Sequence, residues 1–256
     1  MSKPKILILD IETAPILAHV WGLFDQNVAL NMIERDWHVL SWSAKWLDSK
    51  EVMYKDQRGK KNVEDDKDLL KGIWKLLDEA DVIITQNGKK FDIPKLNARF
   101  VINGMKQPSP YQHMDVCRIA RSKFGFTSNK LEYLSKKLNV KYKKQDHKKF
   151  PGFELWKAVL ADNLAAWKEM EKYNKYDVLS LEELYYKLAP WAPTFHFHAE
   201  GKPDACSCGS TRMRLNGHFY NASGKFQRYT CADCGRSRRD SKNLLSKESK
   251  PKKRNL

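Results

Sequence analysis

One stretch near the N-terminus, Leu7-Ile8-Leu9-Asp10-Ile11-Glu12-Thr13, places two acids inside an otherwise apolar run. The apolar residues are typical of a buried β-strand. Because side chains at positions i and i+2 lie on the same face of a strand, Asp10 and Glu12 point the same way. Two neighbouring carboxylates repel each other, and a divalent cation such as Mg²⁺ or Mn²⁺ is the simplest counter-charge. The alternative is a strand end at which both carboxylates are merely hydrated.

Two further acidic clusters follow along the chain. An apolar strand expected at Val82–Thr85 ends in the turn Asn87-Gly88 and is followed by Asp92. In a long helix expected later, Tyr173 and Asp177 are four residues apart and share one helix face. Taken singly, Asp92 has an ordinary explanation as a helix N-cap. The other two residues could be one core residue and one solvated residue of an amphipathic helix.

The elements expected around these clusters define an α/β domain. Strands come first and then alternate with helices, an order that is typical of a mixed central sheet flanked by helices. The sequence predicts strands at residues 6–11, 39–46, 52–55, 82–85 and 112–116, and helices at 67–77, 94–102, 117–124, 130–138 and 160–188.

In order and spacing, the three clusters resemble the motifs of the DEDD (DnaQ-like) 3′–5′ exonuclease superfamily. Its first motif is Asp-x-Glu on the first strand, its second holds an Asp after a strand and a turn, and its third is Tyr-x-x-x-Asp in the tyrosine-type (DEDDy) subgroup. The resemblance covers about residues 5–190 and implies a ribonuclease-H-like fold. The matching residues are Asp10, Glu12, Asp92, Tyr173 and Asp177.

The resemblance implies that two Mg²⁺ or Mn²⁺ ions take part in phosphodiester cleavage. Asp10, Glu12 and Asp177 would hold the metals, with Asp92 binding directly or through water. One metal lowers the pKa of an attacking water, and the other stabilises the leaving 3′ oxygen. Tyr173 would orient that water, because a phenol with an ordinary pKa near 10 is a weak base.

Four other residues of types that can bind metals lie outside the three motifs. Asp115 ends a short apolar strand and competes for a ligand position, although the superfamily pattern is complete without it. His113 and His147 do not match the third-motif histidine of the other DEDD subgroup, so we expect structural or surface roles for both. Cys117 is expected to be a buried apolar residue.

Composition and charge narrow the class of protein. The 256 residues include 47 Lys and Arg against 31 Asp and Glu, a formal net charge of +16. This excess favours nucleic acid as partner, although a basic solvated surface has the same composition. No apolar run approaches the roughly 20 residues of a membrane span, and no secretory signal is visible. We therefore expect a reducing, cytoplasmic location in a bacterial or phage-infected cell, where five Cys do not predict disulfides.

A composition break at Ala189-Pro190-Trp191-Ala192-Pro193 divides the sequence, because two prolines end a helical pattern there. Beyond residue 200 lie four of the five Cys and a net charge of 14 − 4 = +10. The sequence predicts an exonuclease-like domain at 1–190, a linker at 191–205, a cysteine module at 206–240 and a disordered basic tail at 241–256.

The cysteine module contains two short cysteine pairs, each followed by Gly, with 22 residues between the pairs. Four thiolates fit one structural Zn²⁺, and the module resembles a zinc ribbon. The first pair is Cys-x-Cys in place of the usual Cys-x-x-Cys, which leaves His198 or His218 as alternative ligands. Reduced, unbound thiols are the other alternative. The predicted zinc ligands are Cys206, Cys208, Cys231 and Cys234.

Basic residues near the acidic clusters and in the cysteine module are candidate contacts to nucleic acid. Two lysines precede Asp92, the loop at 141–150 carries five Lys together with Tyr142 and Phe150, and the cysteine module interleaves Arg with aromatic residues. A solvated loop and a protein-docking surface are the alternatives. The candidates are Lys89, Lys90, Lys143, Lys144, Arg212, Arg214, Arg228, Arg236, Arg238 and Arg239.

Together these features predict a metal-dependent 3′–5′ exonuclease that releases nucleoside monophosphates from single-stranded DNA. A ribonuclease on the same scaffold and a non-catalytic nucleic-acid-binding protein are the alternatives, with DNA favoured over RNA. A polymerase or another replication protein is a candidate partner, and proofreading, repair and phage replication all suit the same residues. The sequence leaves the oligomeric state open.

Overall fold

The computed structural model of the chain describes residues 4–142, 149–192 and 204–245. Its residues divide into two compact units, one at Lys5–Leu188 and one that comprises Met1–Pro4 and Ala189–Leu256. Within the described residues, none of the helices has both the length and the apolar character needed to cross a membrane.

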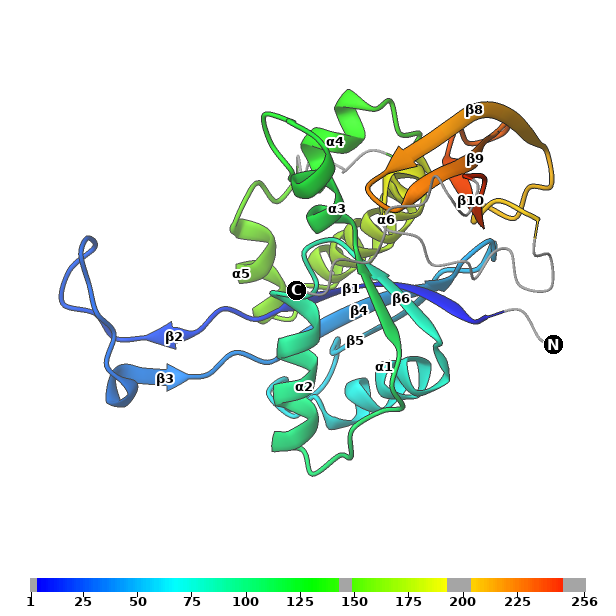
Figure 1. The fold of residues 1–256 in the computed structure, drawn as a ribbon. Helices are drawn as coiled ribbons and strands as arrows, with labels where there is room; N and C mark the ends of the chain where they lie inside the picture. The colour runs from blue at the N-terminus through cyan, green and yellow to red at the C-terminus, as the bar shows by residue number, and fades with distance from the viewer. Residues whose placement is uncertain (1–3, 143–148, 193–203, 246–256) are drawn as a thin grey trace, which may run out of the picture. The chain divides into compact units, whose positions relative to one another are not determined.

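The first unit is built on a five-stranded sheet in the order β5-β4-β1-β6-β7. The central strand β1 is antiparallel to β4 and parallel to β6, and β7 continues the parallel half. The mixed central sheet predicted from the sequence is therefore confirmed (Figure 1). Its strands are β1 (Ile6–Thr13), β4 (Val39–Trp46), β5 (Met53–Asp56), β6 (Val82–Thr85) and β7 (Gln112–Asp115).

Helices cover both faces of the sheet, and successive residues of β1 face them alternately. Leu7, Leu9 and Ile11 join a core cluster with α1 (Lys67–Glu79) and α2 (Asp92–Ile102). The residues between them, which include Asp10 and Glu12, lie on the side toward α6, and α6 also packs on β4. The other helices are α3 (Val116–Lys123), α4 (Leu131–Lys137), α5 (Glu154–Leu160) and α6 (Leu164–Leu188), which is followed by the 3-10 turn η2 (Ala189–Trp191).

The long helix expected at 160–188 is present as α6, but it begins four residues later, after the separate short helix α5, which was not predicted. α5 ends at Leu160, and Asp162 adopts a left-handed φ of 53° that an α-helix cannot include. Asn163 then begins α6, because its Oδ1 accepts hydrogen bonds from the backbone N–H of Ala165 at 2.9 Å and of Ala166 at 3.2 Å. The turn therefore separates α5 from the helix that carries Tyr173 and Asp177.

An arm that the sequence patterns did not predict leaves the sheet between β1 and β4. It consists of β2 (Leu17–Ala18), the 3-10 turn η1 (Leu30–Met32) and β3 (Ile33–Arg35), and β2 pairs antiparallel with β3. Figure 1 shows this arm projecting away from the sheet at the left. We refer to residues 16–35 as the arm.

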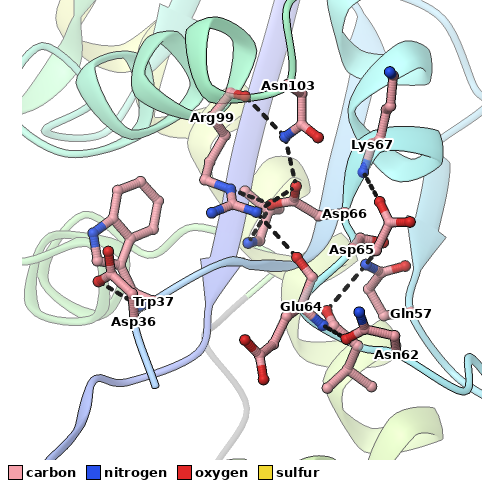
Figure 2. A network of polar contacts seen from close by, with 12 residues as sticks. Asp36, Trp37, Gln57, Asn62, Glu64, Asp65, Asp66, Lys67, Arg99 and Asn103 are labelled. Carbon is pink, nitrogen blue, oxygen red and sulfur yellow. Dashed lines mark hydrogen bonds and ion pairs between the residues drawn. The ribbon is translucent and has the colours of Figure 1, made fainter. Parts of the chain in front are cut away.

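A polar network ties α2 to the start of β4 (Figure 2). Its centre is Asp66, which is fully buried and accepts hydrogen bonds from Arg99 Nε at 2.7 Å, from Arg99 Nη2 at 2.8 Å and from Asn103 Nδ2 at 3.1 Å. The same carboxylate accepts the backbone N–H of Val39 at 3.0 Å. Because α2 also carries Asp92 at its first residue, this network fixes the helix that presents Asp92.

The second unit is a three-stranded antiparallel sheet in the order β10-β9-β8. Gly224, with φ of 153°, closes the β8–β9 turn, where a Cβ would lie 2.2 Å from the side chain of Asn243. The expected start of a disordered tail at residue 241 is wrong, because β10 continues through Asn243 and Leu244 N–H donates to Lys225 O at 2.7 Å. Residues 246–256 of that tail lie outside the described residues. The strands are β8 (Met213–Asn221), β9 (Gly224–Cys231) and β10 (Ser237–Asn243).

Candidate active site

Three carboxylates from distant parts of the chain meet at one point of the first unit. Asp10 and Glu12 extend from β1, and Asp177 extends from α6. One carboxylate oxygen from each lies within 4.8 Å of the other two, and Asp177 is buried. A set of oxygen ligands with three negative charges is the kind that hard divalent cations bind. We call these three residues the carboxylate cluster.

Asn174 holds Asp10 in this arrangement. It lies three residues before Asp177 on α6 and is fully buried. Its Nδ2 donates to Asp10 Oδ2 at 2.5 Å and to the backbone oxygen of Asp10 at 3.3 Å. Its Oδ1 accepts the hydroxyl of Ser41 at 3.2 Å. Asn174 was not predicted from the sequence, although an amide next to Tyr173 on a buried helix face is a signal, since buried amides need hydrogen-bond partners.

Tyr173 lies beside the carboxylate cluster with a side chain that is nearly buried. Burial raises the pKa of its phenol above the ordinary value, and the negative charges of Glu12, Asp177 and Asp10 raise it further. The hydroxyl therefore stays protonated at neutral pH and can donate a hydrogen bond to an oxygen atom in the site. The ring also packs edge-on against Trp156, with 6.2 Å between the ring centroids.

Asp92 approaches the strand from the other side. It is 3% exposed, and its Oδ1 accepts the backbone N–H of Ile11 at 3.1 Å, between the two acids of β1. Burial raises the pKa of this carboxyl to about 7, the Ile11 hydrogen bond opposes the rise, and the charge of Asp115 adds to it. The helix N-cap is Phe91, so Asp92 does not have the ordinary capping role. Asp92 adjoins the carboxylate cluster but is not one of its three members.

Asp115 has a structural position. Its Oδ1 accepts the backbone N–H groups of Asn87 at 2.9 Å and Arg118 at 3.3 Å, and its Oδ2 accepts that of Lys89 at 3.1 Å. It thus caps α3 and fixes the turn before α2, and its carboxylate is not part of the cluster. The turn also needs Gly88, because a Cβ there would lie 2.4 Å from the Thr85 hydroxyl.

Of the remaining residues singled out in the sequence, some have structural positions and the others lie outside the described residues. His113 Nε2 lies 2.8 Å from the Thr85 hydroxyl, and burial lowers the pKa of its imidazole to about 4, which fits a structural residue. Cys117 is buried as an apolar residue. The candidates Lys143, Lys144 and His147 lie outside the described residues, as does His198.

A cavity of about 530 Å³ adjoins the site. Two of its wall residues are sequence neighbours of the acids, because Thr13 follows Glu12 and Phe91 precedes Asp92. Lys95 Nζ lies 3.6 Å from the centroid of the Trp37 ring and 5.3 Å from that of Phe91. Burial lowers the pKa of this lysine. The walls are Thr13, Ala14, Pro15, Ile16, Trp37, Phe91, Lys95, Phe153 and Trp156.

In the second unit, the four cysteines gather as the sequence predicts for a metal site, with their sulfur atoms within 4.8 Å of one another. The Sγ atoms of Cys206 and Cys234 are 3.5 Å apart, and those of Cys208 and Cys231 are 3.7 Å apart. Tetrahedral zinc with Zn–S bonds of about 2.3 Å requires sulfur separations of about 3.8 Å. The donor set therefore fits Zn²⁺. The alternative ligand His218 is not a member of this cluster of described residues.

The basic residues of the second unit differ in their contacts. Arg236 donates to the backbone oxygens of Pro190 at 2.9 Å and Ala192 at 2.7 Å, and also to Ala189 and Ser207. Its guanidinium is thus used within the unit. Three of the others are exposed: Arg214, Arg212, which pairs with Asp233, and Arg239, which lies over Phe226 and Phe219. Arg228 and Arg238 are half-buried and bond to Asn216 O and Ala205 O.

Comparison with known proteins bears on the fold and on the carboxylate cluster. The RNase_H superfamily model matches residues 7–189, which hold the five-stranded sheet except its first residue, Ile6, and all of the cluster. The chain belongs to the RNase H superfamily. This is a superfamily of nucleases that use divalent metals, and the oxygen-rich cluster of Asp10, Glu12 and Asp177 fits such ions.

A solved structure with a similar fold is the family B DNA polymerase from the hyperthermophilic archaeon Pyrobaculum calidifontis. The TM-score is 0.53 and the sequence identity 16%, over 77% of this chain and 25% of the polymerase chain. At this identity the likeness shows the fold alone, and this chain matches only about a quarter of the polymerase's length. The comparison with curated proteins found no match.

Proposed function

We propose that this RNase H superfamily chain is a 3′–5′ exonuclease of the tyrosine (DEDDy) type that degrades single-stranded DNA to nucleoside monophosphates. The observation that carries the proposal is the meeting of Asp10, Glu12 and Asp177 within 4.8 Å, with Tyr173 beside them. The gathering of three acids and a phenol from β1 and α6 supports the reading of these residues as parts of one motif.

The metal-binding residues of the proposal are the carboxylate cluster and Asp92. Two Mg²⁺ or Mn²⁺ ions bound there would supply a water of lowered pKa and a counter-charge for the leaving 3′ oxygen. Asp92 completes the set from the side of α2, directly or through water, since its Oδ1 is bonded to the backbone between Asp10 and Glu12.

The protein groups around the metals have separate tasks. Tyr173 keeps its proton, so it donates a hydrogen bond that orients the attacking water and does not act as the base. Asn174 holds the carboxylate of Asp10 in one orientation. The cavity lined by Trp37 and Phe91 has apolar and aromatic walls that suit the terminal base of a strand. Lys89 and Lys90 are exposed just before α2 and can contact backbone phosphates.

The second unit is proposed to be a zinc ribbon that adds affinity for nucleic acid. Cys206, Cys208, Cys231 and Cys234 would hold one structural Zn²⁺. Exposed Arg214 and the Arg239–Phe226 pair supply charge and aromatic surface for a single strand. Arg236 is not retained in this surface, because backbone carbonyls occupy its guanidinium. Arg212, Arg228, Arg238 and the lysines at 143 and 144 remain candidates.

We propose DNA as the substrate and a polymerase or another replication protein as the partner, a context to which the fold likeness to a DNA polymerase points. The test is digestion of 5′-labelled single-stranded oligonucleotides with Mg²⁺ or Mn²⁺. We expect mononucleotide release from the 3′ end, and a fall of at least about 10³-fold in Asp10→Asn and Asp177→Asn, because metal stabilisation is worth several kcal/mol.

Glu51→Gln is the matched control, since Glu51 is an exposed acid outside the site and should keep full activity. Wild-type activity in Asp177→Asn, or no metal-dependent release from any strand, would contradict the proposal. An RNA oligonucleotide of the same sequence, run in parallel, distinguishes the ribonuclease alternative by its faster digestion.

A further inference from the structure

The arm at residues 16–35 exposes large apolar side chains to an unusual degree. Trp21 is 96% exposed, Leu23 89%, Phe24 82% and Leu30 86%. Single exposed apolar residues are normal, but a contiguous group on one projecting segment marks an interaction surface. Nothing in the proposed exonuclease chemistry uses these side chains.

The arm also lacks a core of its own. The β2–β3 pairing comprises Leu17 with Arg35 and Ala18 with Ile33, and η1 buries none of its residues. Figure 1 shows the arm leaving the sheet, and its residues belong to neither core cluster of the first unit. A two-stranded ribbon is marginally stable in water by itself. The arm therefore gains stability wherever another surface covers it.

Charge indicates which kind of surface that is. Residues 14–34 contain neither Lys nor Arg, in a chain that has 47 of them among 256 residues, and they include Asp25 and Glu34. Contacts to nucleic acid depend on cations that neutralise phosphates, so this segment is the least suited part of the chain for that role. Leu23 and Leu30 also offer no flat face for stacking on bases. The arm is suited to protein.

We propose that the arm is a self-association surface through which two copies of this chain meet arm to arm. Two molecules of formal charge +16 repel each other, and they can approach most closely where positive charge is sparsest: the arm's single Lys or Arg, Arg35, is paired with Glu64 at 3.0 Å. A stable interface takes about 800 Å² from each partner, and aromatic side chains such as Trp21 and Phe24 each supply about 150–250 Å². A two-fold axis places the same apolar side chains against one another.

The experiment is sedimentation velocity of the full-length, zinc-loaded protein, free of nucleic acid, from low to high micromolar concentration. We expect a concentration-dependent dimer of twice 29.9 kDa. Trp21→Glu and Leu23→Glu should each weaken dimerisation at least tenfold, because a charge enters the centre of the apolar contact. Added salt should preserve or strengthen the wild-type dimer, since it screens the repulsion between the basic surfaces.

Val101→Glu is the matched control, because Val101 is 76% exposed on α2 outside the arm, and the variant should dimerise like the wild type. Circular dichroism of the Trp21 and Leu23 variants should match the wild type, since their side chains have few contacts to lose. A wild-type protein that stays monomeric over the whole range would overturn the proposal. So would a dimer that ignores both arm substitutions.

A third result would also overturn the proposal: a wild-type protein that is monomeric, and arm variants that are monomeric as well but bind a single-stranded oligonucleotide more weakly than the wild type. The arm would then be a nucleic-acid surface. Because the primary readout is mass, the result does not depend on whether the chain is an exonuclease, and failure of either proposal leaves the other standing.

Discussion

The carboxylate cluster and the cysteine cluster both bring ligands of one kind together, but by different means. Asp10 and Asp177 are far apart in sequence and are positioned by a sheet and helices with a large apolar core. The four cysteines lie within residues 206–234, in a unit whose buried apolar residues are few, Phe226 among them. The first site is therefore positioned by the fold, whereas we expect the second unit to need a bound metal in order to fold.

Removal of zinc should give the largest effect and separate the two units most clearly. Structural zinc contributes about 10–16 kcal/mol of apparent binding energy in small modules, so chelation should abolish the hydrogen-exchange protection of β8, β9 and β10. The first unit should keep its protection, because its core does not depend on the cysteines.

Cys234→Ala should reproduce this loss without chelator, while Cys117→Ala, in the core of the first unit, should leave the zinc content unchanged. Undiminished protection of the second unit after complete zinc removal would show that its sheet holds together without metal.

Asp66→Ala should damage the first unit alone. The variant leaves Arg99, which is 12% exposed, without its buried partner, and breaking such a pair costs about 3–5 kcal/mol. Thermal unfolding of the first unit should shift down accordingly, while the second unit keeps its zinc. Glu154→Ala, which removes an exposed ion pair with Lys157, should change stability by less than about 1 kcal/mol. Equal effects of the two variants would refute the role given to the network in Figure 2.

Asn174→Ala should weaken metal binding more than folding. Residues that orient metal ligands typically contribute about 10–100-fold to metal affinity, so the Mn²⁺ concentration for half-maximal binding should rise within this range. Ser41→Ala removes only the donor to Asn174 and should have a smaller effect. Unchanged Mn²⁺ affinity in Asn174→Ala would mean that Asp10 needs no help from α6.

The smallest expected effect is a pH dependence confined to the first unit. The pKa of His113 is about 4 in the folded protein and near 6.5 in an unfolded chain. Because the unfolded state binds this proton more readily, the contribution of His113 to stability should fall as pH drops from about 6.5 toward 4, whereas Asp92, whose pKa is raised to about 7, contributes in the opposite sense. His113→Gln should remove this contribution, so the stability difference between the wild type and this variant should change as pH drops from about 6.5 toward 4; for His19→Gln, at an exposed site, the difference should change less. A difference between the wild type and His113→Gln that does not depend on pH over this range would contradict the assignment.

Buried strands were the part of the fold that the sequence predicted best. Residues 39–46 and 82–85 are strands with the expected bounds, because an apolar run between turn signals has few alternatives. The short helix α5 was not predicted, and the start of the long helix was placed four residues too early, ahead of the turn at Asp162. The arm was missed because its apolar residues cover no core, so they follow neither the period of a strand nor that of a helix.

For the site, the motif spacing brought Asp10, Glu12 and Asp177 together correctly, because the topology of the resembling family places β1 against the last helix. The role of Asp115 was not readable, since it depends on three backbone N–H groups that only the folded turn provides. The cavity wall at Trp37 and Lys95 was also missed, because these residues come from separate segments that share no motif.

The most direct test of the central claim is a crystal structure of the protein soaked with Mn²⁺ and a single-stranded oligonucleotide, with the metals located by anomalous scattering. The account predicts two peaks at the carboxylate cluster, bound by Asp10, Glu12 and Asp177, with Asp92 in direct or water-mediated contact and the 3′ end of the strand beside them. Manganese bound elsewhere, with the cluster empty and the strand's end distant from it, would contradict the account.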